Sequence, residues 1–428
     1  MTLSNLFVDC SLLRTNVQFR RLLVARTISL LGLGLLAVAV PVQVYGMTGS
    51  SAAVGLAVAC DGVGMFIGLL LGGVLADRHD RRRLILIARS VCGLGFVGLA
   101  VNSFLPSPSL AAVYALSFWD GFFGALGVNA LMAAMPHIVG RANLMQARAL
   151  GMLTMRFATI VSPALGGLVI ASAGVGWAYV GTAVGTGLTV LTLLGLPRMM
   201  PDAGEIRHPL RMLADAFGFL FGHPVVLGVV GLGSLMTLTT AIRVLFPALA
   251  QDVYGGGAFA VGLLYSAVPV GATLGAALSG WATRVARPGL TMSLVCMGAF
   301  ACVTALGAGG SLFVALPALV LFGYAVSIAS LLQYTIVQGH TPDHFLGRVN
   351  SLWTAQDVFG DSAGTLGLGL LATLLSPAGG ILLFGLSALA LCGLMTALLP
   401  AVRRAPLTDP ALTDPALANP ALAGAQGD

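Results

Sequence analysis

The ionisable side chains that interrupt long apolar segments are the groups of this sequence best suited to chemistry. Asp120 is the clearest of them, because it lies about ten residues into an apolar segment, or about 15 Å deep at the rise of an α-helix. Charge at such a depth is costly and usually serves a function. A buried carboxyl near an arginine can bind and release a proton near neutral pH. We predict substrate or proton work for Asp120, with a fixed ion pair as the alternative.

Other ionisable residues inside apolar segments extend this set: Asp61, Arg156, Arg243, Asp357 and Asp361. Asp357 and Asp361 are one helical turn apart and therefore share a face. Depth along the segments suggests that Asp61 pairs with Arg243. It also suggests that Arg156 faces Asp357 or a ligand oxygen. Structural ion pairing and substrate or proton work are both open for each residue.

Two aromatic residues, Trp119 and Tyr334, are candidates for stacking on an aromatic ligand, although aromatic side chains in such segments more often pack. Arg26 lies near one end of its segment, where its long side chain can reach the membrane surface. No spacing of Cys and His suits a metal, and no paired catalytic constellation is evident. We therefore expect no metal, no cofactor and no enzymatic activity.

The composition identifies the elements that must position these residues. The chain is 57% hydrophobic and 8% charged, whereas a soluble domain carries about a quarter charged residues. Apolar segments of roughly 20 residues, the length that spans a bilayer as a helix, recur throughout. We count twelve, which begin near Leu22, Ala53, Leu84, Leu110, Ala147, Trp177, Val225, Phe259, Leu290, Leu312, Val349 and Ile381. The sequence predicts an all-α protein with twelve transmembrane helices.

The distribution of charge in the loops predicts the orientation in the membrane. Every basic residue apart from histidine is an arginine, and the arginines concentrate in alternate loops, as the positive-inside rule requires. Both termini are therefore expected in the cytoplasm. The formal net charge of +6 follows from this rule, so it does not indicate nucleic-acid binding.

An internal repeat divides the chain into two halves. Gly140-Arg141-Ala142-Asn143 recurs as Gly347-Arg348-Val349-Asn350, an offset of 207 residues, and Gly73 falls on Gly280 at the same offset. Transporters are often built from two such repeats. We expect an N-terminal six-helix half at 1–200, a cytoplasmic linker at 201–222, a C-terminal six-helix half at 223–400 and a disordered tail at 401–428.

The charged turn between the second and third segments has the spacing of a known motif. Gly73, Asp77, Arg78, Arg81 and Arg82 match Gly-x-x-x-Asp-Arg-x-Gly-Arg-Arg of the major facilitator superfamily, with Asp80 in place of the usual Gly. The segment SPALGG at 162–167 resembles the Gly-Pro-x-x-Gly-Gly motif of its exporters. The resemblance implies two pseudo-symmetric six-helix halves and transport out of the cell.

A closer resemblance covers nearly the whole chain apart from the tail. Stretches such as GGVLADRHDRRRLILIAR (72–89) and LGRVNSLWTAQDVFGD (346–361) are similar to a family of catecholate siderophore exporters of enteric bacteria. This resemblance implies export of an apo-catecholate siderophore of the enterobactin type across the cell inner membrane. Proton antiport is the expected energy source, because no GxxxxGK[ST] nucleotide-binding motif is present. The lipid bilayer and periplasmic or outer-membrane efflux components are the expected partners.

Two other functions are compatible with the same sequence. One is broad-specificity multidrug efflux by a transporter of the same superfamily. The other is a non-transporting membrane receptor or assembly factor built on this scaffold.

The charged turn itself is expected to act as a cytoplasmic gate. Asp77 would lie near the start of the eleventh helix, where the helix dipole and Arg348 favour a carboxylate. Such a contact closes the cytoplasmic side, and its loss shifts the conformational equilibrium. Enforcing topology is the plainer role of the arginines, and both roles can hold.

We predict that Asp77→Asn abolishes export while the amount of protein in the membrane stays normal. Secretion assays with membrane immunoblots measure both quantities. Export near the wild-type rate would remove the gating hypothesis.

Overall fold

The computed structural model of the chain describes residues 11–76, 78–140, 143–200, 218, 220–342 and 345–408. Asp77 lies outside the described residues, as does the side chain of Arg348, so the gate stays a prediction. The predicted linker at 201–222 and tail at 401–428 also fall largely outside them.

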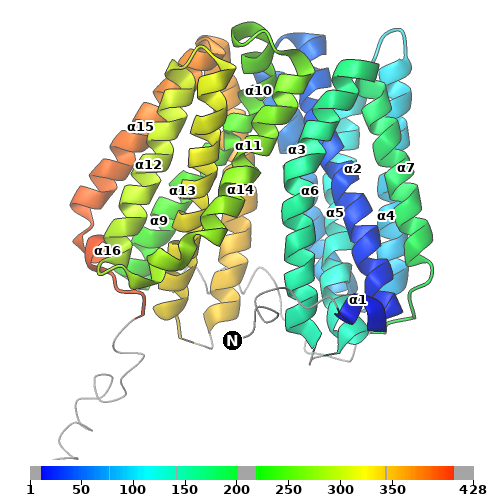
Figure 1. Cartoon of the computed structure of the whole chain (residues 1–428), viewed down its shortest axis with the longest axis horizontal. Helices are drawn as coiled ribbons and strands as arrows, with labels where there is room; N and C mark the ends of the chain where they lie inside the picture. The colour runs from blue at the N-terminus through cyan, green and yellow to red at the C-terminus, as the bar shows by residue number, and fades with distance from the viewer. Residues whose placement is uncertain are drawn as a thin grey trace, which may run out of the picture. The chain divides into compact units, whose positions relative to one another are not determined.

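The described residues form helices throughout, shown in Figure 1. In chain order they are α1 (Ser11–Thr15), α2 (Val17–Thr48), α3 (Ser51–Ala76), α4 (Arg81–Phe104), α5 (Leu110–Val139), α6 (Leu144–Ala173), α7 (Val175–Leu193), α9 (Pro224–Thr240), η3 (Ala241–Leu245), α10 (Phe246–Ala248), η4 (Leu249–Val253), α11 (Gly257–Ala277), η5 (Ser279–Arg284), α12 (Pro288–Ala308), α13 (Leu312–Gly339), α14 (Leu346–Leu374), α15 (Pro377–Leu398) and α16 (Pro400–Arg404).

Among the described residues, 10 helices are long and apolar enough to cross a membrane, with α9 to η4 forming one continuous span. The long helices α7 and α14 complete the set of twelve. Both are more polar, because α7 is rich in threonine and α14 contains Asp357 and Asp361. The prediction of an all-α protein with twelve transmembrane helices is confirmed.

The seventh span is irregular. It changes from α-helix to 3₁₀-helix at Ala241 and to π-helix at Leu249. Pro247, which lies between these two segments, has no N–H to donate to the helix. Such irregular turns inside long helices often mark functional positions. Here the 3₁₀ segment carries Arg243.

Two compact units are present. The first takes in the described residues of Met1–Ile206, Arg243–Pro269 and Thr365–Pro377, and the second those of Arg207–Ile242, Val270–Gly364 and Ala378–Asp428. Each unit combines segments that are separate in the chain, because the units are defined by contacts in space. The halves proposed from the sequence repeat are instead continuous stretches of the chain. In the second unit, α9 meets α13 at Gly233, where a Cβ would overlap the side chain of Gln333.

Glycines let α3 and α5 touch backbone to backbone in the first unit. A Cβ at Gly64 or Gly68 would overlap the carbonyl oxygen of Phe118 or Phe122 on α5. From the other side, a Cβ at Gly121 would overlap the carbonyl oxygen of Asp61 on α3. Small residues allow this approach in membranes, where helix association depends on close packing.

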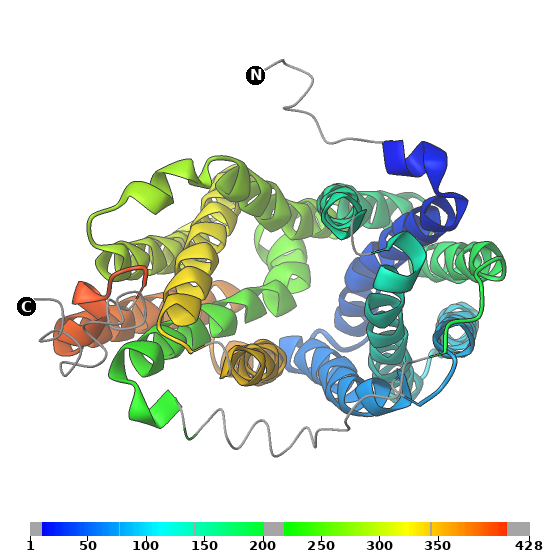
Figure 2. The same ribbon diagram turned by 90° about the horizontal axis from the view of Figure 1, so that it is seen from below.

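Hydrogen bonds from polar side chains join α7 to α2. The hydroxyls of Thr182 and Thr189 donate to the carbonyl oxygens of Gly32 and Ala25, at 3.0 and 3.2 Å. These bonds satisfy hydroxyls that would otherwise face an apolar interior. Figure 2 shows α2 and α7 of this unit side by side.

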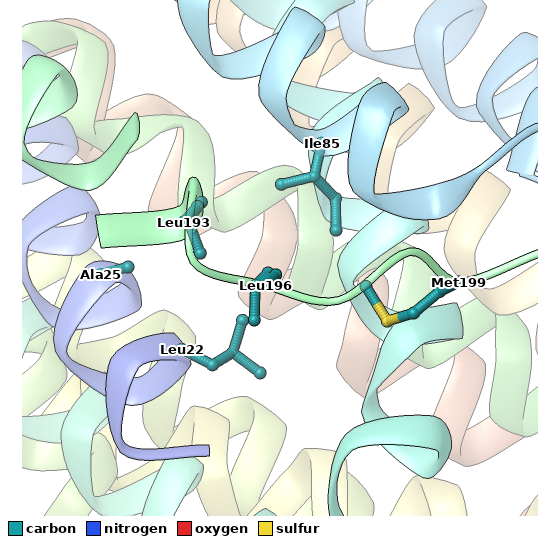
Figure 3. Packing of buried hydrophobic residues seen from close by; sticks show 6 residues of the cluster. All are labelled: Leu22, Ala25, Ile85, Leu193, Leu196 and Met199. Carbon is teal, nitrogen blue, oxygen red and sulfur yellow. The ribbon is translucent and has the colours of Figure 1, made fainter. Parts of the chain in front are cut away.

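The chain that follows α7 is held against the turn between α3 and α4. Figure 3 shows the apolar cluster at this point, made of Leu22, Ala25, Ile85, Leu193, Leu196 and Met199. The buried carboxylate of Asp80 accepts hydrogen bonds from the backbone N–H groups of Arg82, at 3.1 Å, and Met199, at 3.0 Å. The residue that departs from the usual motif therefore caps α4 and anchors the chain after α7 at once.

We predict that Gly121→Ala destabilises the protein by about 1–3 kcal/mol, the usual cost of overpacking, because the new methyl group must push α3 away from α5. Thermal unfolding of the purified protein in detergent measures the effect. Gly187→Ala on α7 is the matched control, since a Cβ there meets no atom within 4 Å. Equal melting temperatures for both variants would contradict the close packing of α3 on α5.

Candidate transport site

The first compact unit contains a cavity of about 300 Å³. This volume lies at the lower end of the roughly 300–1,000 Å³ usual for ligand pockets. The wall is mainly apolar, with a few polar groups that converge on it, the usual composition of a ligand site. It is lined by Leu33, Leu36, Ala37, Val40 and Pro41 of α2, Ala57, Val58 and Asp61 of α3, Leu99 of α4, Ser117 and Asp120 of α5, Arg243 of η3 and Tyr265 of α11.

Three of the charged residues singled out from the sequence line this one cavity: Asp61, Asp120 and Arg243. The contact of Gly121 with the backbone of Asp61 explains how the two carboxylates come together, because Gly121 directly follows Asp120. The cavity thus combines two acids and one guanidinium within an apolar wall. An ion pair between Asp61 and Arg243 stays a prediction, although the structure brings both residues to the same space.

Asp120 is held from α4 by a residue that the sequence reasoning missed. The thiol of Cys92, which is fully buried, donates to Oδ1 of Asp120 at 3.0 Å. Arg89, one turn earlier on α4, attracts the same carboxyl electrostatically. Arg89 could have been found, because it is a charged residue within the third apolar segment. No pattern in the sequence indicated that Cys92 faces Asp120.

Trp119 lies beside the cavity-lining Asp120 but does not itself line the cavity. Its indole Nε1–H donates to the carbonyl oxygen of Val91 at 2.8 Å, and its ring fills the space left by Gly95. Trp119 and Asp120 therefore fasten α5 to α4 at consecutive positions, through Val91 and Cys92.

Arg243 lies on the 3₁₀ turn of the seventh span, next to an aromatic pair. The hydroxyl of Tyr265 donates to the carbonyl oxygen of Arg243 at 3.2 Å. The rings of Tyr265 and Phe246 meet edge to face, with centroids 5.1 Å apart. Tyr265 was not predicted, because a neutral tyrosine within an apolar segment is not distinctive.

A second interaction joins α2 to the end of the seventh span. The hydroxyl of Tyr45, one turn beyond the cavity-lining Pro41, donates to the carboxylate of Asp252. Asp252 lies in η4, at the end of the seventh span, and the sequence analysis gave it no role. Its hydrogen bond to a residue 207 positions away ties η4 to α2.

The other predicted residues lie elsewhere. Arg156 is half-buried on α6 and does not line the cavity. In the second unit, Thr237 and Thr240 of α9 donate to Asp357 and Asp361 of α14, at 3.5 and 3.2 Å. Tyr334 is 47% exposed on α13.

Arg26 lines a smaller cavity of about 20 Å³ together with Arg89. This cavity lies in the first unit among α2, α4, α5 and α7, and it is separate from the one that contains Asp120. At about this volume a cavity holds at most a single water molecule.

The described residues of the predicted gate lie at the turn between α3 and α4. Gly73 has open space where a Cβ would be, and Arg78 is exposed. The backbone N–H of Arg81 donates to the carbonyl oxygen of Met199 at 3.0 Å, and the guanidinium of Arg82 donates to that of Leu194 at 2.6 Å. These contacts hold the chain after α7. Within the described residues, no cluster of His, Cys, Asp and Glu is suited to a metal ion.

Comparison with known proteins identifies the family. The model of the Major Facilitator Superfamily matches residues 22–365. The chain belongs to this superfamily. It is 47% identical over 403 residues to the enterobactin exporter EntS of Escherichia coli O1:K1 and to that of Shigella boydii serotype 18. Each match covers 94% of this chain and 97% of the relative. Membership makes this chain a multi-pass membrane transporter.

Solved structures share the fold at low sequence identity. The nucleoside transporter NupG is 13% identical, with a TM-score of 0.69 that covers 89% of this chain and 98% of NupG. A bacterial homologue of the human lysosomal transporter Spinster is 15% identical, with a TM-score of 0.68 that covers 90% of this chain and 96% of the homologue. These likenesses support the fold alone.

We predict that Tyr45→Phe lowers the free energy of unfolding by about 1.5–3 kcal/mol, because a carboxylate loses its hydrogen-bond donor. Thermal unfolding of the purified protein measures the loss. Tyr254→Phe is the matched control: the buried hydroxyl of Tyr254 has no hydrogen-bond partner among the described residues, so its removal should cost nothing. Equal losses in the two variants would contradict a stabilising bond between Tyr45 and Asp252.

Proposed function

We propose that this protein exports an apo-catecholate siderophore of the enterobactin type across the inner membrane, from cytoplasm to periplasm. The observation that carries the proposal is the 47% identity to enterobactin exporters over 94% of the chain. Such identity extends through the helices that line the cavity, whereas membership of the superfamily alone would leave the substrate open.

The chemistry of the cavity supports this substrate class. A catecholate siderophore combines flat aromatic rings with closely spaced oxygens. The apolar wall of α2 suits the rings, and Arg243 offers a guanidinium to the oxygens. An aromatic residue, Tyr265, lines the same cavity as Arg243.

Two carboxylates in the cavity support proton antiport as the energy source. Asp61 and Asp120 share the cavity with Arg243, so the gain or loss of a proton at either acid changes the charge that the guanidinium experiences. Binding of a proton and binding of the substrate then affect each other through the charge of the same site. An antiporter needs such coupling to exchange one for the other. A proton gradient replaces a cofactor in this scheme.

The proposed orientation follows the positive-inside rule, with both termini in the cytoplasm. Substrate released to the periplasm must still cross the outer membrane, so periplasmic or outer-membrane efflux components are the proposed partners. The six-helix halves at 1–200 and 223–400 are proposed to alternate access to the site.

Secretion in low iron tests the proposal. A strain that lacks this protein and other siderophore exporters should retain the siderophore in its cells, and the wild-type gene should restore the siderophore to the medium. Unchanged secretion in the deletion strain would refute the proposal. A change in drug tolerance without a change in secretion would favour multidrug efflux, and no transport by reconstituted protein under a proton gradient would favour a non-transporting role.

We predict that Asp120→Asn and Arg243→Gln each lower secretion about tenfold or more, the effect of losing about 1.4 kcal/mol. Arg403→Gln is the matched control, because Arg403 is exposed on α16 and does not line the cavity. Immunoblots of membranes check that the variants are present in equal amounts. Wild-type secretion by both cavity variants would remove this cavity from the transport path.

A further inference from the structure

Ser117 lines the cavity, and its hydroxyl is buried. Among the polar cavity-lining residues, it is the one whose side chain has no hydrogen-bond partner within the described residues. The residue is only 5% exposed. A buried hydroxyl without a partner costs about 1–3 kcal/mol. A buried hydroxyl without a partner therefore needs an explanation, and a role in binding a ligand is one.

Other serines on described helices show how the hydroxyl of Ser117 could have found a hydrogen-bond partner. Ser162 donates to the carbonyl oxygen of Ala158 at 2.6 Å, and Ser234 donates to that of Val230 at 3.0 Å. Each bond reaches one helical turn back along the same helix. The Ser117 hydroxyl makes no such bond among the described residues. The hydrogen-bonding capacity of its oxygen is therefore unused within the described residues.

The neighbours of Ser117 define what that molecule would be. Asp120 is one turn further along α5 and lines the same cavity, so the two polar groups share a face of the helix. Arg243 also lines the cavity, while the residues of α2 on its wall are all apolar. The site thus offers a hydroxyl, a carboxyl and a guanidinium beside an apolar surface.

We propose that Ser117 is a substrate-binding residue whose hydroxyl bonds an oxygen of an aromatic ligand with adjacent hydroxyl groups. This proposal rests on the proposed function and adds to it a specificity-determining contact. A serine hydroxyl can accept a hydrogen bond from a phenol and donate one to a phenolate or carbonyl oxygen. A site built to bond a substrate hydroxyl discriminates strongly against analogues without it.

Titration calorimetry of purified protein with apo-enterobactin tests the proposal. Ser117→Ala should weaken binding about tenfold, because one hydrogen bond to the ligand contributes on the order of 1.4 kcal/mol and this energy corresponds to a tenfold change in affinity. Its thermal stability should stay the same or rise, because the substitution removes a buried unpaired hydroxyl. Ser117→Thr keeps the hydroxyl and should keep most of the affinity.

Ser266→Ala is the matched control. The hydroxyl of Ser266 is also buried without a partner in the described part of the chain, but this residue does not line the cavity. Its substitution should leave the affinity unchanged. Equal affinities of Ser117→Ala and wild type would overturn the proposal and leave the proposed function standing. Equal weakening by Ser266→Ala would also overturn it, because the effect would then come from helix packing. A wild-type protein that binds no siderophore would overturn the proposed function, and this contact with it.

Discussion

The contact between α3 and α5, with no side chain between their backbones, is the constraint on which the site depends. Gly121 meets the carbonyl oxygen of Asp61, while Gly64 and Gly68 meet carbonyls of α5. A wider crossing would move α3 away from α5, and these two helices carry the two acids that line the cavity, Asp61 and Asp120. The chemistry of the site therefore rests on residues that have no side chain.

Beside this crossing, α4 supports α5 but contributes little to the cavity wall. Only Leu99 of α4 lines the wall, yet Val91 and Cys92 receive Trp119 and Asp120 at consecutive positions. The helix thus sets the rotation of α5, which decides whether Ser117 and Asp120 face the cavity or a neighbouring helix. A support of this kind fixes a functional side chain more firmly than its own rotamer preference would.

The fold could be predicted almost completely, because the sequence alone shows the length of the apolar segments, the arginine-rich loops and the internal repeat. The site was only partly predictable. Asp61, Asp120 and Arg243 are conspicuous because charge is rare in apolar segments, and the structure brings them together. Cys92, Ser117 and Tyr265 are not conspicuous, because neutral residues of these types serve equally well in packing. Their roles depend on which side of each helix faces the cavity. A helix that is apolar on every side has no contrast between a polar and an apolar face, so its sequence does not indicate which side that is.

The hydrogen bond between Tyr45 and Asp252 joins positions 207 residues apart, which is also the offset of the internal repeat. The bond therefore joins corresponding regions of the two repeats, close to Pro41 and Pro247. A tyrosine can donate to a carboxylate, whereas two tyrosines or two ionised aspartates at these places could not form the same donor–acceptor pair. The contact therefore depends on the difference in sequence between the two repeats at this point.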